Sequence, residues 1–169
     1  PISSKNMSDP LKRIVCINLG TRYLGMAAFQ GADLRDWRVR SFNGKRSKAK
    51  ERKIVGVLQE YLNHWQPEIV VSKEVDHSRS SEELDRLADS LAVILKEHGI
   101  RSKSFSIGSI KSHMLGEEPI SKKALGEELI RRWPSLGHDL RKERASRNSY
   151  YQRMFEAVAL GSMCLKNLN

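Results

Sequence analysis

The sequence predicts an α/β protein in which helices flank a five-stranded mixed sheet. Three short segments open the chain, over residues 13–20, 23–31 and 34–42, and they are rich in β-branched and aromatic residues separated by turn residues. Helical and strand-like patterns alternate after them. An antiparallel meander followed by alternating helices and strands favours a sheet that contains both antiparallel and parallel pairs.

The first predicted helix and the strand after it follow this meander. Apolar residues from Ile54 to Trp65 recur at the spacing of one helix face, which predicts a helix that stops before Pro67. The next segment, EIVVSKEV over 68–75, contains a continuous apolar run. It predicts a buried central strand.

The remainder of the chain continues the alternation. Ser80 and Glu83 form a capping-box pattern that predicts the start of a helix, and Gly99 marks its end. An apolar stripe between Leu84 and Leu95 gives this helix one face for burial. The other predicted elements are a strand over 100–107, helices over 109–115 and 121–133, a basic polar stretch, and a last helix over about 148–166.

Length and charge limit the class of protein. The 169 residues suit one hydrophobic core, so residues 11–169 are expected to form a single domain, with residues 1–10 as a disordered or tag-derived tail. Lys and Arg number 30 against 20 Asp and Glu, which gives a formal charge of +10. Such a surface attracts polyanions, and nucleic acid is favoured over an acidic membrane surface.

The two cysteines, Cys16 and Cys164, lie in apolar segments without a C-x-x-C pattern or a Cys/His cluster. The sequence therefore disfavours a disulfide framework and a structural zinc site, and it fits a reducing compartment. No apolar run approaches the roughly 18 residues that span a bilayer. We expect a soluble intracellular protein.

Two stretches carry the densest positive charge. They cover 45–53 and 140–153, and Tyr150 and Tyr151 lie in the second. Lysine and arginine side chains there would neutralise phosphates, and the tyrosines would stack on exposed bases. A solvated helix start and a solvated loop are the alternative interpretations. The nucleic-acid contacts predicted in these stretches are Lys45, Arg46, Arg141, Lys142, Arg144, Arg147 and Arg153.

Two acidic residues differ from the carboxylates of an ordinary basic protein, most of which lie exposed or in ion pairs. Glu74 ends the apolar run of the predicted central strand, and sites in α/β sheets gather at the carboxyl ends of strands. Asp76 shares its face if the strand continues. Glu156 lies near the edge of the apolar face of the last helix. The alternatives are a lysine-paired carboxylate for Glu74 and an ordinary amphipathic-helix acid for Glu156.

Four stretches follow one another along the chain: CINLGTRYLG with Asn18, IVVSKEV with Glu74, a stretch that contains Lys111 and Lys122, and FEAVAL with Glu156. In this order they resemble the motifs of the RuvC family of Holliday-junction resolvases, within the RNase H-like superfamily. CINLGTRYLG resembles the first-strand motif, with Asn18 in the place of an acid, and IVVSKEV resembles the strand that delivers the second carboxylate, Glu74. Lys111 and Lys122 match the spacing of the family's I/V-K-x4-G-x5-K stretch. FEAVAL resembles the closing helix motif, with Glu156 in place of Asp. The resemblance covers nearly the whole chain and implies an RNase H-like fold.

The resemblance also implies a metal-dependent endonuclease that resolves four-way DNA junctions. Family members hold two Mg2+ or Mn2+ ions through carboxylates, so Asn18 corresponds to the bridging ligand, and Glu74 and Glu156 correspond to flanking ligands. Lys111 and Lys122 correspond to contacts with a phosphate or the transition state, and Lys122 is counted with the catalytic residues. Family members act as homodimers, and a branch-migration motor is a further partner.

Three features depart from the family pattern. Asn18 offers a neutral amide where a bridging anion is expected, which predicts severely weakened metal binding and cleavage. Arg153, beside Gln152, stands where many relatives carry a further acid or histidine, one helical turn before the last carboxylate. The segment between Lys122 and Glu156 is longer than expected and very basic, which indicates a DNA contact specific to this lineage.

Two further expectations concern junction opening and the dimer. His77 stands three residues after Glu74, where the family places the aromatic side chain that opens the junction. We therefore expect His77 to contact DNA and strand separation to differ. The helix over about 81–98 is the candidate dimer interface by resemblance, and its apolar stripe fits a plain core equally well.

Asn18 admits two interpretations. Either it was introduced into an active nuclease to trap the substrate uncut, or the chain is a natural non-catalytic relative that binds branched DNA. Both predict nucleic-acid binding without metal ions. A YqgF-like RNase that acts on structured RNA has the same fold and size and stays an alternative, whereas a sugar kinase needs two such domains. The family implies a bacterial or phage cytoplasm or an organelle matrix.

Overall fold

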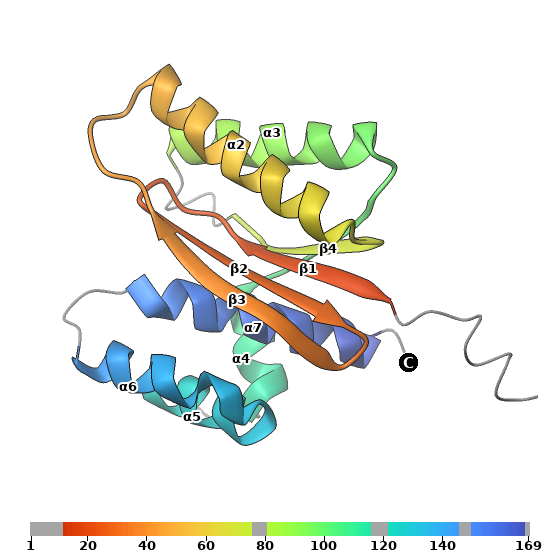
Figure 1. The fold of residues 1–169 in the computed structure, drawn as a ribbon, viewed down its shortest axis with the longest axis vertical. Helices are drawn as coiled ribbons and strands as arrows, with labels where there is room; N and C mark the ends of the chain where they lie inside the picture. The colour runs from red at the N-terminus through yellow and green to blue at the C-terminus, as the bar shows by residue number, and fades with distance from the viewer. Residues whose placement is uncertain (1–11, 76–80, 116–121, 146–149, 168–169) are drawn as a thin grey trace, which may run out of the picture.

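The computed structural model describes residues 12–75, 81–115, 122–145 and 150–167, and it contains a five-stranded sheet between two layers of helices (Figure 1). The strands are β1 (Arg13–Asn18), β2 (Tyr23–Gln30), β3 (Asp33–Ser41), β4 (Ile69–Lys73) and β5 (Arg101–Phe105). The α-helices are α2 (Lys48–Trp65), α3 (Glu82–Glu97), α4 (Ile107–Leu115), α5 (Lys122–Arg132), α6 (Gly137–Ala145) and α7 (Tyr150–Asn167), with a short 3-10 turn at Pro134–Leu136.

The sheet is mixed, as the element order predicted. Its strand order is β3-β2-β1-β4-β5. The first three strands pair antiparallel, and β4 pairs parallel with both β1 and β5. The parallel pairs follow from the crossover helices, since α2 leads into β4 and α3 leads from β4 into β5. The carboxyl ends of β1 and β4 therefore meet at one edge of the sheet.

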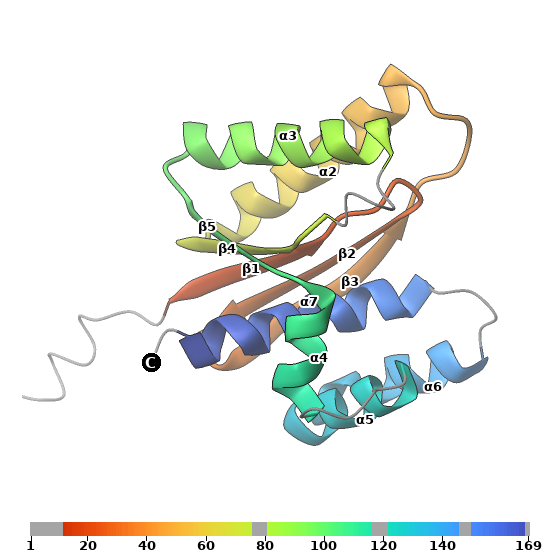
Figure 2. The same cartoon turned by 180° about the vertical axis from the view of Figure 1, so that it is seen from behind.

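The two helical layers cover opposite faces of the sheet. Helices α2 and α3 cover one face, and α7 crosses the other face with α4, α5 and α6 packed against it (Figures 1 and 2). The strands alternate between these layers: Val15 and Ile17 enter the core beside α2 and α3, whereas Ile14 and Cys16 enter the core beside α7. Asn18 continues the second row and faces α7.

Helix α2 begins earlier than its apolar stripe indicated. Its N-cap is Ser47, whose hydroxyl accepts a hydrogen bond of 3.1 Å from the backbone amide of Lys50. Residues 48–53 of the basic stretch are thus helical. The helix ends at Trp65, followed by Gln66 in a left-handed conformation with φ of 44°, so the predicted stop before Pro67 is confirmed.

Two expectations in the helical layers were wrong. Helix α3 is capped by Ser81, which accepts from the amide of Leu84, and not by Ser80, which lies outside the described residues. Part of the basic stretch expected as a loop forms α6, which Asp139 ties to the sheet by accepting a hydrogen bond of 2.7 Å from the indole of Trp37. Helix α6 was not predicted because its polar sequence lacks the apolar periodicity of an amphipathic helix.

The apolar stripe of α3 belongs mainly to the core. Its members contribute to the cluster beside α2, namely Leu87, Leu91, Ile94 and Leu95. Val93 points outward and is 55% exposed. The stripe itself therefore does not identify a dimer interface.

Both cysteines are buried free thiols. Cys16 and Cys164 belong to the same core. Burial raises the pKa of the Cys16 thiol well above its usual value, so this thiol stays protonated. Among the described helices, none combines the length and apolarity that crossing a membrane requires.

Helix α7 lies unusually close to β2. A Cβ atom added to Gly25 would lie 2.2 Å from the backbone carbonyl oxygen of Arg153. At the other end of the contact, a Cβ on Gly161 would lie 2.1 Å from the ring of Phe29. Glycine at both positions is therefore what lets the helix reach the sheet.

We predict that Gly25→Ala lowers the free energy of unfolding by about 1–3 kcal/mol, because a backbone atom, which cannot swing aside, stands in the way of the new methyl. Gly56→Ala is the matched control. Gly56 lies within α2, where an added Cβ meets no atom within 4 Å, so that variant should gain about 0.5–1 kcal/mol of stability. Urea unfolding measures both, and equal stabilities of Gly25→Ala and the parent would contradict the close approach.

Candidate functional site

The candidate site lies where β1 and β4 end beside the first half of α7. Asn18 is the last residue of β1, Glu74 directly follows β4, and Glu156 lies in α7. The elements that carry the three predicted ligand positions therefore come together at one edge of the sheet, and the ends of β1 and β4 and the start of α7 lie on the left in Figure 1.

The amide of Asn18 is held by α7. The residue is 1% exposed, and its Nδ2 atom donates a hydrogen bond of 3.2 Å to the backbone carbonyl oxygen of Arg153. Its Oδ1 atom is buried and has no hydrogen-bond partner among the described residues. An amide suits this position because it supplies a donor to the carbonyl, whereas an ionised carboxylate would bring an acceptor against an acceptor.

Lys73 is a site residue that the sequence did not predict. Its Nζ atom lies 2.9 Å from Oε1 of Glu156, in an ion pair whose side chains are 27% and 11% exposed. The strand register explains the position: Ile17 pairs with Ser72, so Asn18 and Lys73 are the next neighbours on the two strands. The alternation that turns Ile69 and Val71 toward α7 also turns Lys73 that way.

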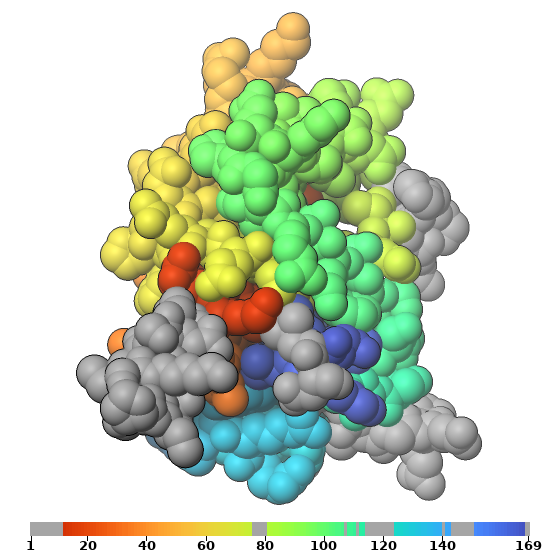
Figure 3. Space-filling view, turned by 90° about the vertical axis from the view of Figure 1, so that its right-hand side faces the viewer, coloured from red at the N-terminus to blue at the C-terminus, as the bar shows by residue number. Residues whose placement is uncertain are grey.

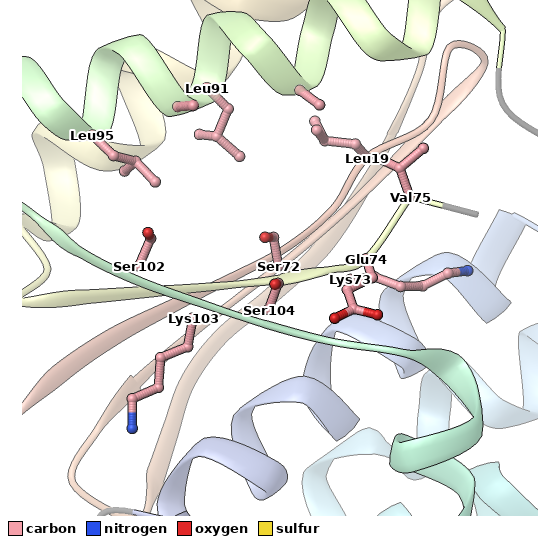
Figure 4. Close-up of a pocket in the computed structure, with 12 residues that line it drawn as sticks. Leu19, Ser72, Lys73, Glu74, Val75, Leu91, Leu95, Ser102, Lys103 and Ser104 are labelled. Carbon is pink, nitrogen blue, oxygen red and sulfur yellow. The ribbon is translucent and has the colours of Figure 1, made fainter. Parts of the chain in front are cut away.

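Glu74 lies just beyond the strand expected to contain it. Strand β4 ends at Lys73, and the amide of Glu74 donates a hydrogen bond of 2.9 Å to the carbonyl of Phe105. The residue lines a groove of about 520 Å³ between the sheet and α3 (Figure 4). In that view the ammonium of Lys73 and the carboxylate of Glu74 point in different directions from the end of β4. Asp76, predicted on the same face, lies outside the described residues.

Arg153 places a second cation at this edge. Its NH1 atom donates a hydrogen bond of 3.2 Å to the carbonyl oxygen of Leu19. The guanidinium covers Gly20, since a Cβ added there would lie 3.2 Å from its Cζ atom. The half-buried arginine therefore lies over the end of β1, one helical turn before Glu156.

Comparison with solved structures places this fold. No family model and no curated protein matches the chain. The structure of Thermus thermophilus RuvC superposes with a TM-score of 0.68 at 17% identity, covering 92% of this chain and 96% of that one. The yeast mitochondrial Holliday junction resolvase Ydc2 gives 0.68 at 14% identity, covering 93% and 79%. The fowlpox virus Holliday junction resolvase gives 0.58 at 12% identity, covering 92% and 99%.

The chain has the fold of the RuvC-like Holliday junction resolvases. This confirms the fold predicted from the four motifs, including the five-stranded mixed sheet and the closing helix. The identities lie well below 25%, so the likeness concerns the fold.

The residues of this resolvase fold do not suit a pair of divalent ions. Among the described residues, no three or more His, Cys, Asp and Glu side chains come together to hold a metal ion. The oxygen of Asn18 is uncharged, and an ammonium already contacts Glu156. Hard divalent cations need anionic oxygen ligands, and two positive side chains at the same edge repel them.

The structure shows the exposure of some of the side chains that were predicted to contact DNA. Lys45 and Arg46 are exposed before α2, and Arg141 and Lys142 are exposed on α6. Tyr151 is half-buried and packs against the core. The side chains of Lys111 in α4, Lys122 at the start of α5, Arg144 in α6 and Tyr150 in α7 lie outside the described set, as do residues His77 and Arg147 altogether.

The basic segments converge on the edge that holds Asn18. The first turn of α2, the last turn of α6 and the first turn of α7 all lie at this edge in both ribbon views (Figures 1 and 2). The opposite edge, which faces the viewer in Figure 3, carries the start of β1 and the last turn of α7. Segments far apart in the sequence thus bring basic residues to the side of the molecule that holds the candidate site, where the acidic first turn of α3 also lies.

Arg46 also has a structural partner that the sequence did not indicate. Its Nε atom lies 3.2 Å from Oε2 of Glu83, a carboxylate in the first turn of α3 that is 1% exposed. Neither oxygen of Glu83 has a hydrogen-bond partner among the described residues. The arginine therefore supplies the nearby countercharge of a buried carboxylate.

We predict that Arg46→Ala lowers the free energy of unfolding by about 1–3 kcal/mol, because Glu83 is left buried without its countercharge. The exposed neighbour Lys45 provides the control, and Lys45→Ala should leave stability unchanged. Adding Glu83→Gln to Arg46→Ala should recover part of the loss. Equal unfolding midpoints for Arg46→Ala and Lys45→Ala would contradict a stabilising role for Arg46. Its predicted role as a nucleic-acid contact would then be the one that is left.

Proposed function

We propose that this protein binds four-way DNA junctions and, in the sequence as it stands, leaves their strands intact. The observation that carries the proposal is the ion pair between Lys73 and Glu156 next to the amide of Asn18. It fills the centre of a resolvase fold with a lysine and a neutral side chain. Two-metal phosphodiester hydrolysis needs a set of anionic ligands at this place.

Charge and fold support DNA as the ligand. The chain carries a formal charge of +10, and its exposed basic segments lie around the candidate edge. The structures of similar fold include T. thermophilus RuvC with Holliday junction substrate and the fowlpox virus resolvase with Holliday junction DNA. Phosphate neutralisation by lysine and arginine gives affinity without metal ions.

A homodimer matches the symmetry of a four-way junction, because two copies would meet equivalent strands. Val93 of α3, exposed at 55%, is an apolar side chain available for such a contact. A branch-migration motor and an intracellular compartment stay predictions of the family resemblance.

A second candidate is a Mg2+ or Mn2+ dependent junction endonuclease disabled by Asn18 alone. One observation favours it: the Oδ1 atom of Asn18 is buried and has no partner in the described part of the chain, as a ligand atom would be. Glu74 and Glu156 lie at the same edge. The two candidates differ in what Asn18→Asp does.

We predict that the parent and Asn18→Asp both bind a synthetic four-way DNA junction in EDTA, and that neither cuts it in Mg2+ or Mn2+. The physical reason is that Asn18→Asp restores one carboxylate while Lys73 and Arg153 keep their positive charges at the site. Gel-shift titration measures binding, and denaturing gels measure cleavage. Matched duplex DNA and structured RNA are the comparison ligands.

Each of the other outcomes would indicate a different function for this protein. Symmetric nicks in the junction by Asn18→Asp would establish the endonuclease and make Asn18 a disabling substitution. Tighter binding to structured RNA than to the junction would favour an RNA-directed function. Equal binding to junction and duplex would contradict selectivity for branched DNA.

We predict that the double variant Arg141→Ala/Lys142→Ala weakens junction binding and makes its dependence on log salt concentration shallower by about 2, since two phosphate contacts are lost. The control is Lys96→Ala, at the carboxyl end of α3 and away from the candidate edge in Figure 1. Its affinity and salt dependence should match the parent. An unchanged slope in the double variant would remove α6 from the interface.

A further inference from the structure

We propose that Lys73 is a built-in cation that takes the place of a divalent metal ion at Glu156. Its ammonium approaches the carboxylate to 2.9 Å and is held there by a strand on one side and a helix on the other. The Glu156 side chain is 11% exposed, so its charge has lost most of its contact with water. A buried carboxylate needs a countercharge, and here a covalently attached one supplies it.

The neutral side chain of Asn18 is compatible with the ion pair between Lys73 and Glu156. Asn18 lies beside Lys73 in the strand register and carries no charge. A carboxylate at position 18 would compete with Glu156 for the ammonium or attract a second cation. The amide instead satisfies the carbonyl of Arg153 and leaves Lys73 to a single acid.

Among the residues that the structure describes, the charges at the edge balance without any ion. Glu74 and Glu156 contribute two negative charges, and Lys73 and Arg153 contribute two positive ones. The hydrogen bond from Arg153 to the carbonyl of Leu19 keeps the guanidinium at this edge. A divalent ion entering here would meet two like charges and, among the described carboxylates, one that is outside the ion pairs, namely Glu74, so its binding is disfavoured.

This inference goes beyond the proposed function, because it concerns metal binding by the protein alone and does not require DNA. Its test is a calorimetric titration of the DNA-free protein with Mn2+, for the parent and for Lys73→Gln. The parent should show no specific Mn2+ site. Lys73→Gln removes the ammonium but keeps a side chain of similar length, and its affinity for Mn2+ should rise about tenfold or more as Glu156 becomes available.

Two matched variants define the origin of that gain. Lys73→Gln/Glu156→Gln should lose it, because the carboxylate is gone. Lys103→Gln changes another half-buried lysine, on β5 two register positions before Phe105, the partner of Lys73. Figure 4 shows its ammonium directed away from the end of β4, so its Mn2+ binding should equal that of the parent.

Thermal unfolding gives a second readout, since Lys73→Gln leaves an unpaired carboxylate and lowers stability. Added Mn2+ should raise the unfolding temperature of Lys73→Gln and leave that of the parent unchanged. Specific Mn2+ binding by the parent that disappears in Glu156→Gln would overturn the proposal, and this holds even if Lys73→Gln fails to fold. A folded Lys73→Gln with no gain in Mn2+ affinity would overturn it as well.

Discussion

The site depends on the contact between the backbone of α7 and the ends of β1 and β2. The carbonyl oxygen of Arg153 occupies the space that a Cβ of residue 25 would need, and Asn18 donates its amide hydrogen to the same oxygen. Both contacts use a backbone atom, so they fix the rotation and height of the helix together. One turn further on, Glu156 is thereby aimed at Lys73. Without this contact the ion pair and the position of the guanidinium would both be lost.

The sequence allowed the sheet to be predicted from local pattern, because apolar and β-branched runs mark strands and turn residues separate them. The three ligand positions came from the resemblance of their motifs to the RuvC family, and the parallel pairing of β1 with β4 explains why Asn18 and Glu74 lie at one edge of the sheet. Glu156 joined them through the motif in its helix. The strands and helices are consequences of local pattern, which a single chain encodes strongly.

Other features required tertiary information. Lys73 became part of the site through a register between strands far apart in the chain and through the rotation of α7, and neither has a local signal. The partner of Arg46 is likewise a carboxylate on another helix. Helix α6 lacks an apolar period and is tied to the sheet by the hydrogen bond from Trp37 to Asp139. Pairing between side chains on distant segments could thus not be predicted from the sequence.

The balance of charges at the candidate site explains how a protein with a resolvase fold could bind DNA without metal ions. A cluster of unpaired carboxylates would repel a phosphate: a unit charge at about 4 Å costs roughly 4 kcal/mol at an effective dielectric constant of about 20. Here Glu156 is paired with Lys73, and Arg153 lies over the adjoining strand end. In the complex that we propose, the phosphate backbone would therefore approach the edge in the absence of divalent ions, drawn by the exposed lysines and arginines around it. The same two cations that disfavour metal binding remove the repulsion that a metal would otherwise have to neutralise.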